Sequence, residues 1–220
     1  MQKKTAVIFG ATGLTGSIVL KKLIQDERYE KVKVFTRSEP EIKSDKLEII
    51  NTELENLELY SDKISGDDVF CCLGTTIKKA GSKENFKKVD LEWPALIAEI
   101  ASKNKVPNFL MISSIGADPE SSNFYLRTKG EAERAVRQHD FNKVIILRPS
   151  MLLGKRREFR FFEELGKIIM VPLKFLFRGK LRKYRPINSE RVASAMIKFA
   201  NITTSKYVFE SHEIELYTKS

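Results

Sequence analysis

The chain opens with a pattern of apolar and polar positions that changes its period at a turn. Ala6–Phe9 is an unbroken apolar run, and it leads directly into a segment rich in glycine. From about Gly13 to Asp26 the apolar residues recur every three or four positions, with lysines between them. A short apolar run followed by this spacing predicts a strand, a tight turn and an amphipathic helix.

The same alternation continues along the rest of the chain. We expect further strands at residues 31–36, 47–51, 67–73, 109–112 and 143–147. We expect helices at residues 84–104, which Pro94 would kink or break, and at residues 123–138. Residues 77–83 read as a basic loop, and residues 185–188 as a short strand before a last helix that Asn188 or Ser189 would cap.

Three glycines spaced G-x-x-G-x-x-G occupy the turn after the first strand. We expect Gly10 to allow the tight turn, Gly13 to leave room for a pyrophosphate, and Gly16 to let the helix pack closely. The unpaired N–H groups and positive dipole at a helix start favour a phosphate. The turn residues expected to bind a dinucleotide are Gly10, Thr12, Gly13, Leu14, Thr15 and Gly16. The alternative is a glycine-rich turn that binds nothing.

Alternating strands and helices around such a turn predict an α/β fold with a doubly wound parallel sheet, the Rossmann fold. Val69–Cys72 is apolar at every position, as in a strand buried on both faces of a parallel sheet. The length of 220 residues suits a single NAD(P)-binding domain spanning residues 1–220. Residues 150–187 would add a small basic C-terminal lobe for a substrate or partner.

Two further segments refine the expected cofactor. In NAD-selective sites an acidic residue about 20 positions beyond the glycines binds the ribose hydroxyls. Arg37 stands there instead, and no acidic residue occurs until Glu39. Because a guanidinium pairs well with a 2′-phosphate, we expect NADP(H) rather than NAD(H), unless Arg37 is solvated or stacks on the adenine. A second glycine turn ends the strand at 67–73, and its residues Leu73, Gly74 and Thr75 should line the cofactor.

Composition is ordinary, with 42% hydrophobic and 31% charged residues, and no run approaches the roughly 20 apolar residues of a membrane span. No secretory signal precedes the first strand, and adjacent Cys71 and Cys72 are poorly placed to pair, so we expect a cytoplasmic protein without disulfides. His139 and His212 stand far apart without ligand-like neighbours, so we expect no metal site.

The net charge of +10 is concentrated in residues 154–185, which hold eleven Lys or Arg and three Glu. Bulky apolar residues are interleaved with these cations. They would pack the segment on the core, with the cations solvated, or form a pocket for an anionic small-molecule substrate. Contact with an acidic protein or with an anionic membrane surface fits the same pattern. Nucleic acid ranks last, because no groove-reading motif accompanies the charge.

Tyr125 and Lys129 are four residues apart in a predicted helix, so they share one face. Ser113 and Ser114 end the preceding strand, at the same sheet edge as the glycine turns. A nearby ammonium would stabilise the phenolate and lower its pKa, which makes the phenol a better proton donor or acceptor. A serine would hydrogen-bond a substrate carbonyl oxygen as charge builds on it. Alone, this tyrosine–lysine spacing is more typical of a surface helix, and the order of the motifs gives it weight.

The combination resembles the short-chain dehydrogenase/reductase superfamily, in its atypical extended branch, over residues 4 to about 200. The glycine motif at residues 10–16 is similar to that of the branch. Arg148–Ser150 resembles the segment that passes the nicotinamide in extended members. The segments that look like the Tat-interacting oxidoreductase relatives are Cys71–Thr76, Ser113–Asp118, Ser121–Tyr125 and Lys129–Glu131.

The resemblance implies an NADP(H)-dependent oxidoreductase that transfers a hydride to or from a small carbonyl or alcohol. It implies a Ser114–Tyr125–Lys129 active site, with Tyr125 as proton donor or acceptor and Pro149 beside the cofactor. The asparagine that many superfamily members place beside the lysine has no counterpart that the sequence identifies. Some relatives bind cofactor without turnover, so the alternative is a regulatory or assembly protein that docks an acidic partner or membrane through its basic lobe. An epimerase or dehydratase usually needs a larger lobe than residues 150–220 provide.

Overall fold

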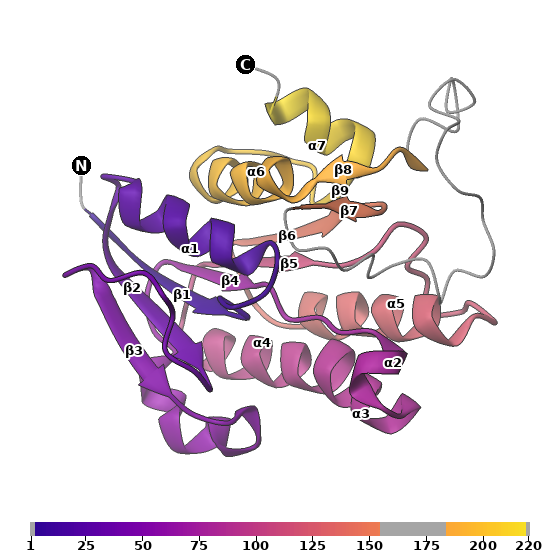
Figure 1. The fold of residues 1–220 in the computed structure, drawn as a ribbon, viewed down its shortest axis with the longest axis horizontal. Helices are drawn as coiled ribbons and strands as arrows, with labels where there is room; N and C mark the ends of the chain where they lie inside the picture. Colours follow the sequence, from indigo (N-terminus) through magenta and orange to yellow (C-terminus); the bar gives the residue numbers. More distant parts are fainter. Residues whose placement is uncertain (1–2, 155–183, 219–220) are drawn as a thin grey trace.

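A seven-stranded parallel sheet forms the centre of the computed structural model, which describes residues 3–154 and 184–218 (Figure 1). Its strand order is β3-β2-β1-β4-β5-β6-β9, and every neighbouring pair is parallel. The strands of this sheet are β1 (Lys4–Phe9), β2 (Tyr29–Thr36), β3 (Leu47–Asn51), β4 (Asp68–Cys71), β5 (Asn108–Ile112), β6 (Lys143–Arg148) and β9 (Val208–Glu210). The order reverses between β1 and β4, where dinucleotide-binding folds hold their ligand. The doubly wound parallel sheet predicted from the sequence is confirmed.

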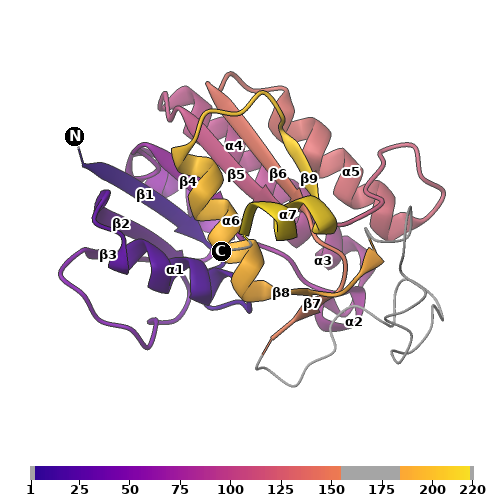
Figure 2. The same ribbon diagram turned by 90° about the horizontal axis from the view of Figure 1, so that it is seen from above.

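Helices cover both faces of the sheet (Figures 1 and 2). One face is covered by α1, α6 and α7, and the other by α4 and α5. These five helices are α1 (Gly16–Gln25), α4 (Trp93–Lys103), α5 (Phe124–Arg137), α6 (Ser189–Asn201) and α7 (Ser211–Thr218). The arrangement explains why β4 is buried along its whole length.

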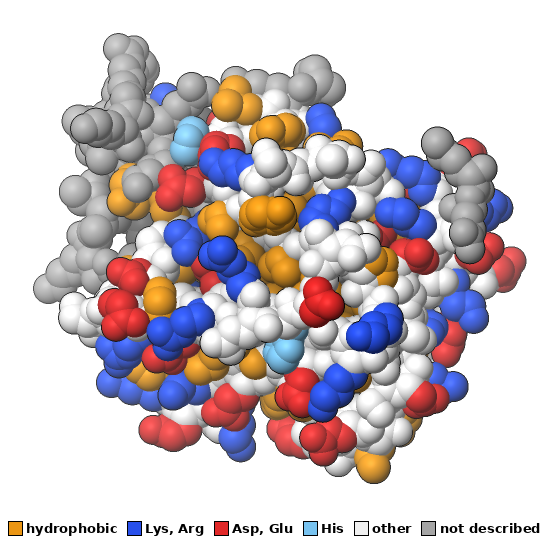
Figure 3. Space-filling view, turned by 180° about the vertical axis from the view of Figure 1, so that it is seen from behind, with side chains coloured by type: hydrophobic (Ala, Val, Ile, Leu, Met, Phe, Trp, Pro, Cys, Tyr) orange, Lys and Arg blue, Asp and Glu red, His pale blue; other side chains and the backbone are white. Residues whose placement is uncertain are grey.

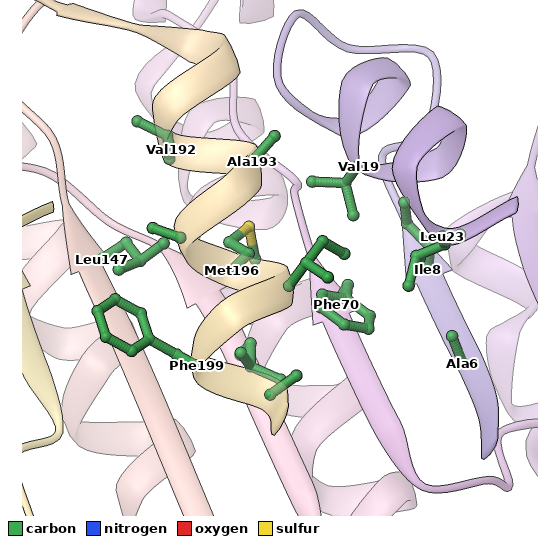
Figure 4. Packing of buried hydrophobic residues seen from close by; sticks show 14 of the residues in the cluster. Ala6, Ile8, Val19, Leu23, Phe70, Leu147, Val192, Ala193, Met196 and Phe199 are labelled. Atoms are coloured by element: carbon green, nitrogen blue, oxygen red, sulfur yellow. The ribbon is translucent and has the colours of Figure 1, made fainter. Parts of the chain in front are cut away.

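Two hydrophobic cores lie on the two sides of the sheet because side chains alternate along each strand. On β1, Ala6 and Ile8 belong to the core under α1 and α6, while Val7 and Phe9 belong to the core under α4 and α5. All four side chains are fully buried. Figure 4 shows Met196 of α6 between Phe70 of β4 and Leu147 of β6, which belong to the same core. Full burial of one large apolar side chain contributes about 1.5–3 kcal/mol, so both cores stabilise the sheet.

The segment at residues 77–83 is helical, so the predicted loop there was wrong. Helix α2 (Ile77–Ala80) begins where the Thr76 hydroxyl accepts from the backbone N–H of Lys79, and it ends at Gly81 with φ +78°. Helix α3 (Lys83–Lys87) then begins at Ser82, whose hydroxyl caps it in the same way. Side-chain caps at both starts explain how such short helices form among basic residues.

The predicted helix at residues 84–104 is divided in three. After α3, the chain makes one π-type turn, η2 (Lys88–Glu92), before α4 begins at Trp93. Pro94 lies in the first turn of α4, where its missing N–H leaves no hydrogen bond unmade. The break therefore falls where the sequence predicted it, and the wider turn in front of Pro94 is new.

Several short elements have no counterpart in the sequence prediction. They are the 3-10 helix η1 (Leu54–Lys63), strand β7 (Leu152–Leu153), strand β9 and helix α7. The short strand expected at residues 185–188 is confirmed as β8 (Ile187–Asn188), which pairs with β7. The cap expected on the last predicted helix is confirmed, because Asn188 Oδ1 accepts from the backbone N–H of Glu190 at the start of α6.

Most of the basic segment predicted as a lobe, residues 155–183, lies outside the described residues. On the face shown in Figure 3, the described Lys and Arg side chains intermingle with Asp and Glu. Within residues 3–154 and 184–218, no helix combines the length and apolar character needed to cross a membrane.

Candidate functional site

The turn between β1 and α1 has a geometry that requires glycine at two of its positions. Gly10 has φ +76°, and a Cβ there would lie 2.6 Å from the carbonyl oxygen of Cys72. A Cβ on Gly16 would lie 2.1 Å from the carbonyl oxygen of Gly10. A Cβ on Gly13 would meet only the Gly10 carbonyl oxygen, at 3.2 Å, so the rest of its surroundings are open. The turn is thus held tightly against the β4 edge and leaves space over its middle.

A polar atom at this turn has no partner within the described chain. The Thr15 side chain is buried, and its Oγ1 makes no hydrogen bond to any described residue. A buried hydroxyl without a partner is costly, and a phosphate oxygen at the start of α1 would satisfy it. The first turn of α1 carries no acidic residue that would repel such a group. The residues present therefore fit a dinucleotide pyrophosphate.

The loop after β4 lies beside this turn, because the backbone N–H of Cys72 donates to the carbonyl of Phe9 at 2.9 Å. The strand ends at Cys71, so Leu73, Gly74 and Thr75 all belong to the loop. Leu73 and Thr75 are half-buried, and Gly74 is exposed. The two glycine turns therefore lie next to each other at the carboxyl edge, where the strand order reverses.

Arg37 follows the last residue of β2, next to the glycine turn in strand order. Its side chain is 72% exposed, and its Nε lies 3.8 Å from a carboxylate oxygen of Glu53. An exposed pair at this distance contributes little stability. The guanidinium is consequently available to an anionic group at the carboxyl edge.

Tyr125 and Lys129 lie on one face of α5, as their spacing predicts. Asn123 caps the start of this helix, because its Oδ1 accepts a hydrogen bond from the backbone N–H of Leu126 at 3.1 Å. The ring of Tyr125 packs 5.5 Å from that of Phe86 on α3, and both Tyr125 and Lys129 are buried. Neither belongs to the exposed surface of a helix, so the alternative of a surface helix pair is wrong.

Lys129 contacts a carboxylate that the sequence analysis did not single out. Its Nζ lies 2.6 Å from Asp90 Oδ1, and Asp90 is buried on η2. Burial lowers the pKa of Lys129, but the nearby Asp90 and Tyr125 outweigh it and hold that pKa above its usual range. The lysine is therefore a buried cation. No sequence signal set Asp90 apart, because it is one of several charged residues at the start of the predicted helix over residues 84–104.

Asp90 also holds the second glycine turn. Its Oδ2 accepts a hydrogen bond from the backbone N–H of Thr75 at 2.8 Å. A Cβ on Gly74 would lie 3.6 Å from Asp90 Oδ1 and 3.7 Å from Lys129 Nζ. The expected cofactor loop and the expected proton-transfer pair are thus brought together around one carboxylate.

The two serines after β5 have different surroundings. The hydroxyl of Ser113 donates to Glu133 on α5, which also accepts three hydrogen bonds of 2.5 to 3.2 Å from Arg148. Among the residues that the structure describes, the Ser114 hydroxyl donates only to the neighbouring carbonyl of Ile115, at 3.3 Å. Ser113 is thereby committed to a buried ion pair, and Ser114 is the serine with hydrogen-bonding capacity to offer.

Pro149 and the two cysteines also lie close to the carboxyl ends of the strands. The carbonyl of Pro149 accepts from the backbone N–H of Ile115 at 3.0 Å, which joins the loops after β5 and β6. Burial raises the pKa of the Cys71 thiol to about 12 and that of Cys72 well above its usual value, so neither is a thiolate at neutral pH. Among the described residues, no group of three or more His, Cys, Asp or Glu side chains is placed to hold a metal ion.

Comparison with known proteins agrees with this geometry. A family model described as NAD(P)H-binding matches residues 10–201. Protein HTATIP2 of Rattus norvegicus is 37% identical over 164 residues, which cover 73% of this chain and 67% of the rat protein. Protein FMP52-1, mitochondrial, of Scheffersomyces stipitis is 33% identical over 226 residues, covering 98% of this chain and 99% of the yeast protein.

A solved structure of MoeE5 in complex with UDP-glucose and NAD has the same fold, with a TM-score of 0.68 at 17% identity. The match covers 96% of this chain and 79% of MoeE5. At this identity the likeness extends to the fold alone. Taken with the family match, it shows that the chain belongs to the NAD(P)H-binding Rossmann family, as an atypical short-chain dehydrogenase/reductase-like protein homologous to HTATIP2 and FMP52.

Proposed function

We propose that the protein is an NADP(H)-dependent oxidoreductase of the short-chain dehydrogenase type, acting on a small carbonyl or alcohol. The observation that carries this proposal is the position of Lys129. Its Nζ lies 2.6 Å from Asp90 and 3.7 Å from the place of a Gly74 Cβ, so the cation stands between α5 and a loop at the carboxyl edge. A buried ammonium in this place serves both a cofactor ribose and the phenol of Tyr125.

Each side chain then has a separate task. Tyr125 gives a proton to the substrate oxygen in reduction and takes one in oxidation. Lys129 stabilises the phenolate form and donates hydrogen bonds to the ribose hydroxyls. Ser114 donates to the substrate oxygen as negative charge builds there. The nicotinamide, when bound, supplies or accepts the hydride.

The cofactor would be held by the turn residues and by loops at the same edge. Thr15 Oγ1 and the N–H groups at the start of α1 would receive the pyrophosphate, with Thr12, Gly13 and Leu14 alongside. Arg37 would pair with a 2′-phosphate, which is why NADP(H) is preferred over NAD(H) in this proposal.

The proposal is tested with NADPH and a panel of aldehydes and ketones, following the nicotinamide absorbance. The Tyr125→Phe variant should lose turnover by about 100-fold or more while keeping NADPH affinity. Tyr29→Phe is the matched control, because Tyr29 is equally buried but lies at the opposite end of β2. Unchanged turnover in Tyr125→Phe would exclude the assigned role.

Tight NADPH binding without oxidation of any compound in the panel would favour the alternative, a non-catalytic NADP(H)-binding regulatory or assembly protein. The basic charge of residues 154–185 motivates it. Pull-down with a variant charge-reversed in that segment would then test docking to an acidic partner. The cytoplasmic location expected from the sequence also stays a prediction, since the yeast FMP52 relatives are named mitochondrial.

A further inference from the structure

We propose that Asp90 is a positioning residue for Lys129 that keeps Tyr125 in its protonated, proton-donating form. This inference rests on the proposed function, which assigns proton transfer to Tyr125 and Lys129. It concerns a residue that lies outside the serine–tyrosine–lysine set and outside the glycine turns.

The first argument is geometric. Asp90 is 1% exposed, and its two carboxylate oxygens reach two different elements. One oxygen lies 2.6 Å from Lys129 Nζ on α5, and the other accepts from the backbone N–H of Thr75 at 2.8 Å. The carboxylate therefore fixes the ammonium against the loop after β4. A lysine side chain has four rotatable bonds, and this contact selects one of its arrangements.

The second argument comes from the backbone that carries Asp90. It lies in the π-type turn η2, between α3 and α4. Such turns are uncommon, cost hydrogen-bond geometry and occur frequently at functional sites. Asp90 is the one buried residue of η2, so the turn delivers a single carboxylate into the interior.

The third argument is charge balance around Lys129. Asp90 on η2 contacts the ammonium, and Tyr125 on α5 and Cys71 at the end of β4 are the other titratable groups whose charge acts on the pKa of Lys129. Glu133, one turn further along α5, is neutralised by Arg148 at 2.5 Å. Among residues 3–154 and 184–218, with the phenol and the thiol protonated, the charges of Asp90 and Lys129 balance each other in this buried site. Loss of a proton from the tyrosine–lysine pair then creates a buried negative charge, which is unfavourable.

Removing the charge of Asp90 reverses this balance. The site would carry a buried positive charge, and loss of one proton from the tyrosine–lysine pair would neutralise it. The pair titrates as a unit, so its first proton would leave at lower pH. Asp90 thus extends to higher pH the range in which Tyr125 can donate a proton, as carbonyl reduction requires.

The experiment is a spectroscopic titration of the protein without substrate. Tyrosinate absorbance is followed against pH in the wild type and in Asp90→Asn, each after subtraction of the same protein carrying Tyr125→Phe. We expect the Tyr125 transition in Asp90→Asn to move down by about 1 pH unit or more. An unchanged or higher midpoint in the folded variant would overturn the inference.

Two variants control the result. Asp68→Asn removes another buried carboxylate with a lysine partner, Lys4, and should leave the Tyr125 transition unchanged. Asp90→Glu keeps the charge, so its midpoint should stay near that of the wild type while NADPH affinity falls as the lysine moves. If Asp90→Asn does not fold, a midpoint in Asp90→Glu shifted as far as 1 pH unit would contradict the charge argument instead.

The titration separates this inference from the proposed function. It needs neither turnover nor cofactor, so a lowered midpoint supports the role of Asp90 even where the carbonyl panel gives no reaction. Where turnover is found, the alkaline limb of the kcat profile for reduction should also move to lower pH in Asp90→Asn.

Discussion

A buried aspartate, a lysine and a tyrosine lie together at both edges of the sheet. At the amino edge, Tyr29 donates to Asp68 Oδ2 at 2.6 Å, and Lys4 Nζ lies 3.1 Å from the same oxygen. Asn108 donates to the other oxygen at 2.7 Å, and Asn201 donates to the Tyr29 hydroxyl at 3.0 Å. Every polar atom of this aspartate and this phenol is therefore used within the protein.

The cluster at the carboxyl edge has the same residue types in a different arrangement. Asp90 contacts Lys129 and a backbone N–H, and Tyr125 lies one helical turn from the lysine. The lysine side chain is 7% exposed here, against 27% for Lys4 at the amino edge. The buried lysine contacts a loop at the carboxyl edge, whereas the partly exposed one belongs to a closed network. Composition alone does not distinguish the two clusters, and the partners of each oxygen do.

The presence of a cavity does not by itself mark an edge of the sheet as a binding site. The amino edge holds a cavity of about 910 Å³ lined by Lys4, Arg28, Asn108 and Lys143. Lys143 Nζ donates to carbonyls of Phe199, Ala200 and Ile202 at the end of α6, at 2.9 to 3.2 Å. These cations satisfy a helix terminus, as lysines at a helix carboxyl end do.

We expect the largest difference between the two edges of the sheet when one glycine at each edge is replaced by alanine. In Gly16→Ala the new Cβ would lie 2.1 Å from the Gly10 carbonyl oxygen, and in Gly66→Ala, before β4, it would lie 2.8 Å from that of Thr5. Both variants should be less stable by about 1–3 kcal/mol. Only Gly16→Ala should raise the Kd for NADPH, by about 100-fold, in a fluorescence titration. Equal NADPH affinity in folded Gly16→Ala would remove the glycine turn from the binding site.

A smaller effect is expected from the two arginines that flank β2. Arg37→Ala at the carboxyl end should weaken NADPH binding about 10-fold and leave NADH binding unchanged, because an exposed guanidinium–phosphate pair is partly screened. Arg28 precedes β2 and pairs with Asp26 at 2.5 Å, so Arg28→Ala should leave both affinities unchanged. Calorimetric titration with each nucleotide measures these differences. Equal losses for NADPH and NADH would contradict the 2′-phosphate assignment.

The smallest effect concerns the pH dependence of stability at the amino edge. Burial, together with the charge of Asp68, raises the pKa of Tyr29 above its ordinary value of about 10. Below about pH 10 the phenol is protonated in both folded and unfolded states, so its contribution is constant. Above that pH the unfolded state binds fewer protons, and the contribution of Tyr29 falls by at most about 1.4 kcal/mol per pH unit.

Urea unfolding of the wild type and Tyr29→Phe across this range isolates the contribution of Tyr29. The stability difference between the two proteins should be constant below about pH 10 and should shrink above it. A difference that grows with pH would show that Tyr29 ionises more easily in the folded state, against the closed network described above.

The sequence predicts well what depends on neighbouring residues. The turn at Gly10, the cap at Asn188 and the period of α5 are local, and the bounds expected for β3 and α5 agree with the structure within a residue or two. Strand β9 has only three residues, too few to show a period, so it could not be predicted.

Asp90 could not be assigned from the sequence for a different reason. In a regular helix over residues 84–104 it reads as one more polar position, and the π-type turn changes where it points. Its partners, Thr75 and Lys129, are 15 and 39 positions away, brought close only by the sheet. Likewise, the choice between Ser113 and Ser114 depended on Glu133, which lies on a later helix.

The placement of α6 has a consequence for how the chain folds as it is synthesised. This helix covers the middle strands of one face, yet it begins at Ser189, after all the strands of the sheet except β9 have emerged. Until then, the α6 side chains that share a core with Phe70 and Leu147 are missing, although both residues are fully buried in the finished protein (Figure 4). A nascent chain halted before residue 189 presents an apolar sheet face to the ribosome exit and to chaperones. Translation of about the last seventh of the chain is therefore the step that completes the folded domain.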